Sequence, residues 1–186
     1  MEVNLSWDLF IFVFLLVIVA YSIMIGKDQT IKVILSSYIA ILASDGIGNL
    51  VAQAIEKSSI IAKILNEGAV DKVQILVKIA FFVLLTVLLT TRGAFNIVVS
   101  EGRNGFVRMV MTGIYGVLSA GLLLSTILVI LSGNSVMASG NFLGVNPVET
   151  IAEGSRFISL LIEHYALFFS LPAVVFVISS LFGNEE

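Results

Sequence analysis

The chain has 186 residues, of which 58% are hydrophobic and only 12% charged, and its formal net charge is −3. A soluble globular domain carries about 45–50% apolar and about 25% charged residues, so this composition excludes an ordinary soluble fold. The small net charge and the lack of a basic tract argue against a nucleic-acid partner. The absence of cysteine excludes disulfides, thiolate chemistry and cysteine-ligated metal or iron–sulfur sites.

Five apolar runs occupy most of the chain. They cover residues 9–25, 31–44, 73–89, 110–131 and 157–182. A helix needs about 20 mostly apolar residues to cross the hydrocarbon core of a bilayer, which is ~30 Å thick. We therefore expect a single helical membrane domain over residues 1–186. Its predicted class is an all-α integral membrane protein, a bundle of four to five transmembrane helices with two interfacial amphipathic helices.

The first predicted helix covers residues 6–25. Ser6 is a suitable N-cap, Asp8 lies in the first turn where the helix dipole favours an acid, and Gly26 follows the last turn. The residues before the apolar run include two acids and no base, unlike the start of a signal peptide. We therefore expect this helix to remain in the mature protein.

The second run ends in a polar segment, Ser44-Asp45-Gly46-Ile47-Gly48-Asn49. Two glycines around an acid weaken a helix, so a break is predicted here. Ser44 or Asp45 would then cap a separate amphipathic helix over residues 50–66, with Asp45 at the water interface. The alternative is a broken or re-entrant helix in which Asp45 lines a polar cavity, since acids at membrane depth often mark ion paths.

The third predicted helix covers residues 73–91 and is rich in leucine, phenylalanine and valine. Few small residues interrupt it, so we expect it to face lipid over much of its surface. Lys78 lies about one turn inside this helix. Its long stem predicts that the ammonium group reaches out to the membrane surface.

The fourth predicted helix starts near residue 106 and is distinguished by small residues on one face. Small residues let two helices approach closely where lipid supplies no hydrophobic drive. This pattern predicts that the fourth helix is the central packing helix of the bundle. The residues of the predicted packing face are Gly105, Gly113, Gly116 and Ala120.

The C-terminal third leaves two interpretations open. Asn146-Pro147-Val148-Glu149 is typical of a helix start and predicts a second amphipathic helix, which leads into apolar residues 166–182. Pro172 predicts a kink there. Residues 147–182 form either one tilted span or a surface helix followed by a short span. Glu163 and His164 invite the idea of a proton relay, but neighbouring residues point about 100° apart on a helix, which favours a solvated face.

The candidates for chemistry are few. Asp45, Asn49, Glu163 and His164 form the candidate polar membrane site. The sequence lacks the glycine-rich phosphate loop, HExxH, GxSxG and CxxC patterns of common enzyme families. A single histidine is too few for an ordinary zinc site. We therefore expect no enzymatic activity, no catalytic residue, no cofactor and no metal centre.

The distribution of basic residues gives a weak indication of orientation. If all five runs cross the membrane, one side receives Lys27, Lys32, Arg92, Arg103 and Arg108, and the other Lys57, Lys63, Lys72, Arg156 and Lys78. The first helix decides the near tie, because no base precedes it and Lys27 follows it directly. Basic residues favour the cytoplasmic side, which predicts an external N-terminus.

Three places in the chain carry a family resemblance: Gly26-Lys27 with the serine-bearing helix after it, the apolar third helix with its polar connector, and the approach to helix four, Arg103-Asn104-Gly105-Phe106-Val107-Arg108. Over residues 7–132 the chain resembles the colicin V production (CvpA) family of small bacterial membrane proteins. The resemblance implies a protein of the cytoplasmic (inner) membrane, tied to toxin or protein export or to envelope upkeep, with no enzymatic step.

Three functions stay open from the sequence. The first is the non-enzymatic export or envelope role implied by the resemblance, with the lipid bilayer and other membrane proteins or further copies of the chain as partners. The second is a small channel or transporter for ions or solutes, with Asp45, Asn49, Ser36, Tyr38 and either Glu163 or His164 around its path. The third is an accessory subunit of a larger membrane complex.

Overall fold

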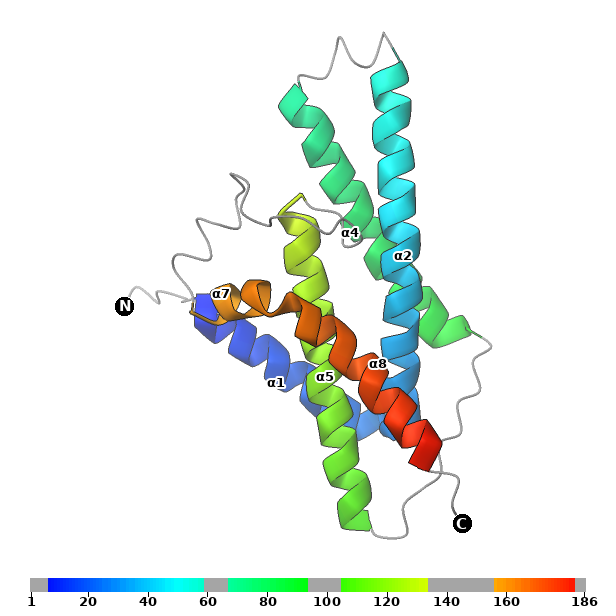
Figure 1. The fold of residues 1–186 in the computed structure, drawn as a ribbon, viewed down its shortest axis with the longest axis vertical. Helices are drawn as coiled ribbons and strands as arrows, with labels where there is room; N and C mark the ends of the chain where they lie inside the picture. Colours follow the sequence, from blue (N-terminus) through cyan, green and yellow to red (C-terminus); the bar gives the residue numbers. More distant parts are fainter. Residues whose placement is uncertain (1–6, 59–66, 94–104, 134–155, 183–186) are drawn as a thin grey trace.

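The structure, a computed structural model, describes residues 7–58, 67–93, 105–133 and 156–182, and these segments are almost entirely helical (Figure 1). In chain order the helices are α1 (Trp7–Ile25), α2 (Lys27–Lys57), α4 (Glu67–Arg92), α5 (Gly105–Leu131), α7 (Arg156–Glu163) and α8 (Tyr165–Phe182). No strand occurs within these segments. The predicted all-α class is confirmed.

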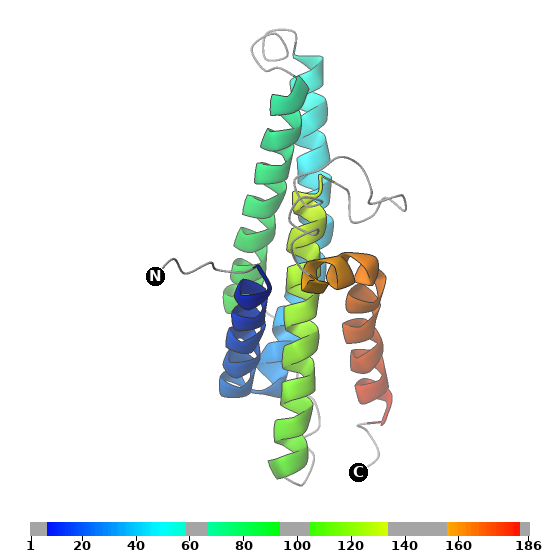
Figure 2. The ribbon, with the colours of Figure 1, turned by 90° about the vertical axis from the view of Figure 1, so that its left-hand side faces the viewer.

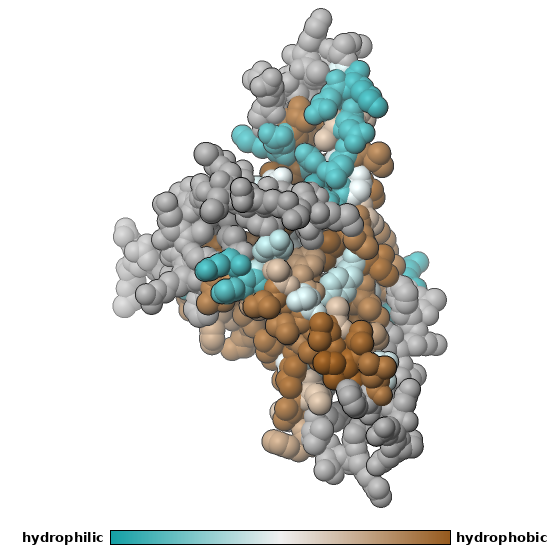
Figure 3. Space-filling model, viewed as in Figure 1, coloured by the Kyte–Doolittle hydropathy of each residue, from teal (hydrophilic) through white to brown (hydrophobic). Residues whose placement is uncertain are grey.

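Four of these helices are long and apolar enough to cross a membrane. Their spanning stretches are Asp8–Ile25, Lys27–Lys57, Val70–Arg92 and Met109–Leu131, and α8 adds a shorter apolar stretch, Tyr165–Leu181. Helices suit the hydrocarbon core of a membrane because each helix pairs its own backbone N–H and C=O groups in hydrogen bonds where no water is present. Many leucine, valine and phenylalanine side chains of these helices are exposed, and apolar surface covers much of the lower body of the molecule in Figure 3. The chain is a multi-pass membrane protein.

Helix α5 lies at the centre of the bundle (Figures 1 and 2). It contacts α1, α2, α4, α7 and α8. In its spanning stretch 61% of the residues are buried, against 11% in those of α1 and α4. The prediction that this helix is central is confirmed. The third predicted helix, now α4, leaves most of its spanning stretch unburied, which agrees with the prediction that it faces lipid.

Helix α2 runs without interruption from Lys27 to Lys57. The predicted break at residues 44–49 is therefore wrong, and residues 50–57 continue α2 instead of starting an amphipathic surface helix. Residues 59–66 of that predicted helix lie outside the described residues. The physical reason is the relative size of two free-energy costs. A mid-helix glycine costs about 1 kcal/mol, whereas each backbone group left without a hydrogen bond in an apolar interior costs several kcal/mol.

The far ends of α2 and α4 extend past the rest of the bundle (Figures 1 and 2). We call residues 50–57 and 67–73 the α2–α4 arm. Among the arm residues whose burial the structure describes, the exposed charged ones are Glu56, Lys57, Asp71 and Lys72. Figure 3 shows hydrophilic surface over this end of α2 and α4. The bundle thus has an apolar body and one polar projection.

The C-terminal region separates into two helices. Helix α7 ends at Glu163 and α8 begins at Tyr165, and α7 runs crosswise to α8 (Figures 1 and 2). Ile158 and Leu161 of α7 are buried, whereas Leu160 is exposed. Residues 156–182 thus form two helices and not one continuous helix, which agrees with the second of the two predicted alternatives. The predicted start of that surface helix at residue 147 lies outside the described residues.

Candidate functional site

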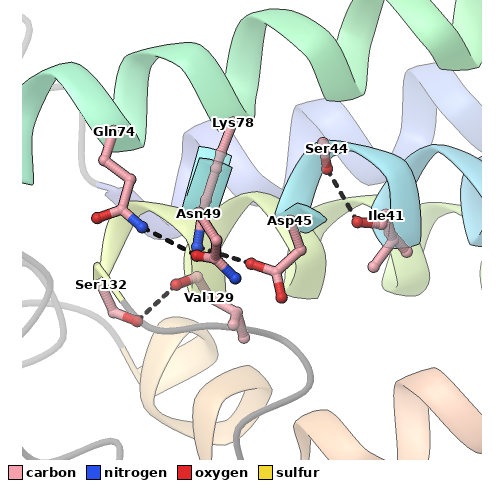
Figure 4. Close-up of polar contacts among 8 residues, drawn as sticks. All are labelled: Ile41, Ser44, Asp45, Asn49, Gln74, Lys78, Val129 and Ser132. Carbon is pink, nitrogen blue, oxygen red and sulfur yellow. Dashed lines mark hydrogen bonds and ion pairs between the residues drawn. The ribbon is translucent and has the colours of Figure 1, made fainter. Parts of the chain in front are cut away.

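A buried ion pair joins α2 to α4. The Lys78 Nζ lies 2.6 Å from the Asp45 Oδ1, and the two side chains are only 4% and 6% exposed (Figure 4). Asp45 is therefore inside a continuous helix and does not cap one at the water interface. Lys78 is held inside the bundle and does not reach the membrane surface. Both predictions were wrong for the same reason, because each considered one charge without its partner.

Gly48 explains why Lys78 can stay inside. A Cβ atom at this position would lie 2.3 Å from the Lys78 Cγ and 2.7 Å from its Cε. The aliphatic stem of Lys78 thus occupies the volume that any other residue at position 48 would fill. Gly46 differs, since its Cβ would meet nothing within 4 Å. One of the two glycines that predicted a helix break instead makes room for the charged side chain that crosses the interface.

A second polar contact lies one helical turn away from the ion pair. The Gln74 Nε2 donates a hydrogen bond of 3.0 Å to the Asn49 Oδ1. Asn49 follows Asp45 by four residues, and Gln74 precedes Lys78 by four (Figure 4). The two contacts run in opposite chain order on the two helices, which is the register of an antiparallel pair facing along one seam. Four polar side chains therefore form one cluster at the base of the α2–α4 arm.

The cost of this cluster makes it a candidate for function. Charges within membrane helices are expensive, and by default they suggest a functional site. An apolar pair of similar volume often holds two helices as well as a buried ion pair, or better. Adhesion between α2 and α4 alone therefore does not account for Asp45 and Lys78.

The remaining members of the predicted polar site lie elsewhere. Glu163 ends α7 and His164 stands between α7 and α8, and both side chains are exposed. Asp45 and Asn49 share the cluster on α2, so the four predicted residues occupy two separate places. Sequence reasoning missed Lys78 and Gln74 as members of the cluster. The available signal was that Gln74 and Lys78, like Asp45 and Asn49, are polar residues four positions apart, and that they interrupt the apolar run 73–89.

The predicted packing face of α5 is only partly a contact face. A Cβ at Gly116 would lie 2.9 Å from the Ser22 Cβ of α1, and Ala120 is fully buried. Gly105 and Gly113 differ, since a Cβ at either would meet nothing within 4 Å. Gly121, which the prediction left out, receives the Phe168 ring of α8, whose Cδ1 would lie 2.6 Å from an added Cβ.

Two tyrosines attach α8 to the bundle through its backbone. Tyr38 of α2 donates a hydrogen bond to the Phe169 carbonyl oxygen, and Tyr115 of α5 donates one of 3.4 Å to the Val175 carbonyl oxygen. Pro172 lies between the two acceptors and has no N–H to give to the preceding turn. Neighbouring helices commonly bond such disturbed backbone in membranes. Tyr38 therefore has an anchoring role that the sequence did not indicate.

Comparisons of the chain with protein-family models, with curated proteins and with solved structures give no match. The resemblance to the CvpA family thus stays a prediction. The functional argument below depends on the geometry of the chain itself.

Proposed function

We propose that this chain is a non-enzymatic protein of the bacterial cytoplasmic membrane that acts in toxin or protein export or in envelope maintenance, as the membrane-embedded member of a larger assembly. The α2–α4 arm carries this proposal. Two helices continue beyond the apolar body (Figure 1), and the exposed charged side chains described at their end are Glu56, Lys57, Asp71 and Lys72. A projection with mixed charges suits a specific contact with a polar protein surface outside the bilayer.

The polar cluster supports the arm at its base. The Asp45–Lys78 ion pair and the Asn49–Gln74 hydrogen bond fix the register of α2 against α4 directly below the projecting residues. Apolar packing tolerates sliding, whereas paired buried polar groups lose their partners when the register shifts. The cluster therefore holds the charged end of the arm in one orientation relative to the membrane, as docking requires.

The charge distribution supports an orientation with the arm outside the cytoplasm. With Lys78 buried, the side of the arm keeps the basic residues Lys57, Lys63, Lys72 and Arg156. The opposite side receives Lys27, Lys32, Arg92, Arg103 and Arg108. Basic ends favour the cytoplasm, so α1 begins outside and the arm projects outward.

The absence of cysteine allows a direct test of this orientation. Single variants Lys57→Cys and Arg92→Cys place one thiol at an exposed site on each end. Treatment of intact cells with a membrane-impermeant maleimide should label Lys57→Cys and leave Arg92→Cys unlabelled until the membrane is opened. The reverse pattern would invert the proposed orientation.

The proposed role is tested by deletion of the gene followed by complementation. Deletion should weaken the cell envelope or lower the amount of exported protein, and the wild-type gene should restore the lost property. A variant with alanine at Glu56, Lys57, Asp71 and Lys72 should reach normal membrane levels without restoring function. A matched variant with alanine at the lipid-facing Leu84 and Val87 should restore it. Full restoration by the arm variant would remove the arm from the proposal.

The buried ion pair favours a second candidate function, a small ion or solute transporter centred on Asp45. Flux of ions into liposomes that contain the purified protein tests it, with Asp45→Asn as the comparison. Equal flux in the two preparations, or none in either, would rule this function out.

A further inference from the structure

The lipid-facing surface has its full height on the side of α4. The exposed charged residues Lys72 and Arg92 mark the two ends of this surface, and the helix between them rises about 30 Å. Exposed apolar side chains such as Leu76 and Leu84 occupy the stretch in between. This height equals the ~30 Å hydrocarbon core of an ordinary bilayer. The side of the bundle formed by α2 and α4 therefore fits a membrane of normal thickness.

The other side of the bundle, formed by α1, α7 and α8, is bounded at one end by α7. We call these three helices the α1–α7–α8 flank. Helix α7 runs crosswise (Figures 1 and 2), and its Ile158 and Leu161 are buried in one cluster with Leu124 of α5. Glu163 at the end of α7 and His164 after it are exposed. The polar edge of this flank thus lies at the level of Leu124.

The opposite edge of the flank is the junction of α1 and α2. Helix α2 begins there with the polar residues Lys27, Asp28 and Gln29, and the Lys27 Nζ lies 5.8 Å from the centre of the Tyr115 ring of α5. Between Tyr115 and Leu124 the helix α5 rises only about 14 Å. With the ~5 Å radius of α7 added, the two polar edges lie about 20 Å apart. This height is well below that of an ordinary hydrocarbon core.

Helix α8 agrees with the reduced height of the flank. Its apolar stretch, Tyr165–Leu181, is shorter than the four spanning stretches. It is about 25 Å long and inclined to α5 (Figure 1), so it covers still less along the direction of α5. Its exposed apolar side chains include Val174 and Ile178. Lipid against this flank therefore meets an apolar surface that is too short for it.

A bilayer of normal thickness would have to cover the start of α5 as well. Helix α5 begins beyond the junction of α1 and α2 (Figures 1 and 2), and its first turns expose Phe106 and Met109. Covering these side chains with hydrocarbon would place Lys27 and Asp28 inside the apolar core, where charges are costly. The headgroup layer, in contrast, accepts aromatic and apolar side chains. A membrane drawn inward to the charged junction is thus the less costly arrangement.

We propose that the α1–α7–α8 flank binds a locally thinned bilayer, so that the chain thins the membrane on one side only. Lipid adapts to a short apolar surface by thinning, at a cost that grows with each ångström of mismatch. Phospholipids with short acyl chains pay less of this cost and should gather along the flank. Neither the export role nor the transporter requires this property.

Quenching of tryptophan fluorescence by brominated lipid measures which lipids contact each side of the bundle. The single tryptophan of the sequence, Trp7, is first replaced by phenylalanine. A new tryptophan is then placed at an exposed position, by Val174→Trp on α8 or by Leu84→Trp on α4. The full chain is reconstituted in equal mixtures of phosphatidylcholines with chains of about 14 and about 22 carbons, of which one or the other is brominated.

The two tryptophan positions should differ in their lipid preference. At position 174 we expect the short-chain lipid to associate at least about threefold more strongly than the long-chain lipid. At position 84 we expect no such preference, because the height of α4 matches an ordinary bilayer.

A variant without the polar edge tests the role of α7. Glu163→Leu with His164→Leu makes this edge apolar, and it should reduce the short-chain preference at position 174 to about half or less. Thr91→Leu with Arg92→Leu is the matched change at the exposed end of α4 and should leave the preference at position 174 unchanged. An undiminished preference in the α7 variant would overturn the proposal.

Two further results would overturn it, and both come from the protein with an intact α7. Equal quenching by the two lipids at position 174 would show that the bilayer keeps its normal thickness along the flank. Absence of quenching by either lipid at this position would show that protein, such as a second copy of the chain, covers the flank in place of lipid.

Discussion

Two interfaces of this bundle are built on opposite principles. Between α2 and α4, long polar side chains cross the seam, and Gly48 makes room for one of them. Between α5 and its neighbours α1 and α8, the contacts are short and mostly apolar, with Gly116 against Ser22 and Gly121 against the Phe168 ring. The first interface depends on matched polar groups and the second on close packing.

The comparison shows that glycine has different roles in the same kind of helix. Gly116 brings two helices close together, as small residues commonly do in membranes. Gly48 instead leaves space for the aliphatic stem of Lys78, which a side chain at position 48 would exclude from the interface. Substitutions should therefore be costly at both interfaces, but for reasons that matched variants can separate.

The largest effect is expected from breaking the ion pair. Asp45→Ala leaves the Lys78 ammonium buried without its carboxylate, which should lower the free energy of unfolding by about 3–5 kcal/mol. The double variant Asp45→Leu/Lys78→Met removes both charges and should lie within about 1 kcal/mol of wild type. Unfolding in mixed detergent micelles measures both. Equal losses in the single and the double variant would show that packing volume, rather than charge, holds this interface.

A smaller effect is expected where the stem of Lys78 passes α2. Gly48→Ala forces the Lys78 side chain to move, because the added Cβ would lie 2.3 Å from its Cγ, and it should cost about 1–3 kcal/mol. Gly46→Ala is the matched control, since its Cβ meets nothing within 4 Å and alanine favours the helix by about 1 kcal/mol. A shift of the same sign in both variants would contradict the role given to Gly48.

The close-packed interface has its own matched pair. Gly116→Ala places a Cβ 2.9 Å from the Ser22 Cβ, and the resulting separation of α1 from α5 should cost about 1–2 kcal/mol. Gly113→Ala lies on the same helix with open space around its Cβ and should be neutral or stabilising. Thermal unfolding in detergent distinguishes them. If Gly113→Ala were the more damaging change, the contact face of α5 would not be the one described above.

The smallest effect concerns the attachment of α8. Tyr38→Phe removes the hydrogen bond to the Phe169 carbonyl and should cost about 0.5–1.5 kcal/mol. Tyr21→Phe is the control, because Tyr21 is 54% exposed. Thermal unfolding measures the difference, and an equal response in both variants would show that the α8 backbone does not need this donor.

The predictions from sequence succeeded where many residues contribute to one property. Membrane helices follow from apolar runs of sufficient length, and the central position of α5 follows from its many small residues. They failed where one residue was judged by its local preference. Gly46 and Gly48 weaken an isolated helix, but in α2 the surrounding helices make an unbroken backbone far cheaper than a break.

The candidate site was half predicted. Asp45 and Asn49 were singled out because polar groups in an apolar run are costly, and this argument applies equally to Lys78 and Gln74. What the sequence lacked was the rotation and register of α4 against α2, which decide whether Lys78 turns inward or reaches the surface. Glu163 and His164 were grouped with Asp45 because they too are ionisable residues in or beside apolar runs. Residue type alone carries no information about the distance between two residues in the fold.

The amino-acid sequence by itself determined that this protein is a helical membrane bundle, because hydrophobic length is a property of each segment separately. Only the tertiary structure decided that Asp45 meets Lys78, that Gly48 admits the lysine stem, and that α2 continues unbroken into a projecting arm. Those features depend on which faces of two distant segments are opposed, and the free energy that selects them arises only once the helices have packed together.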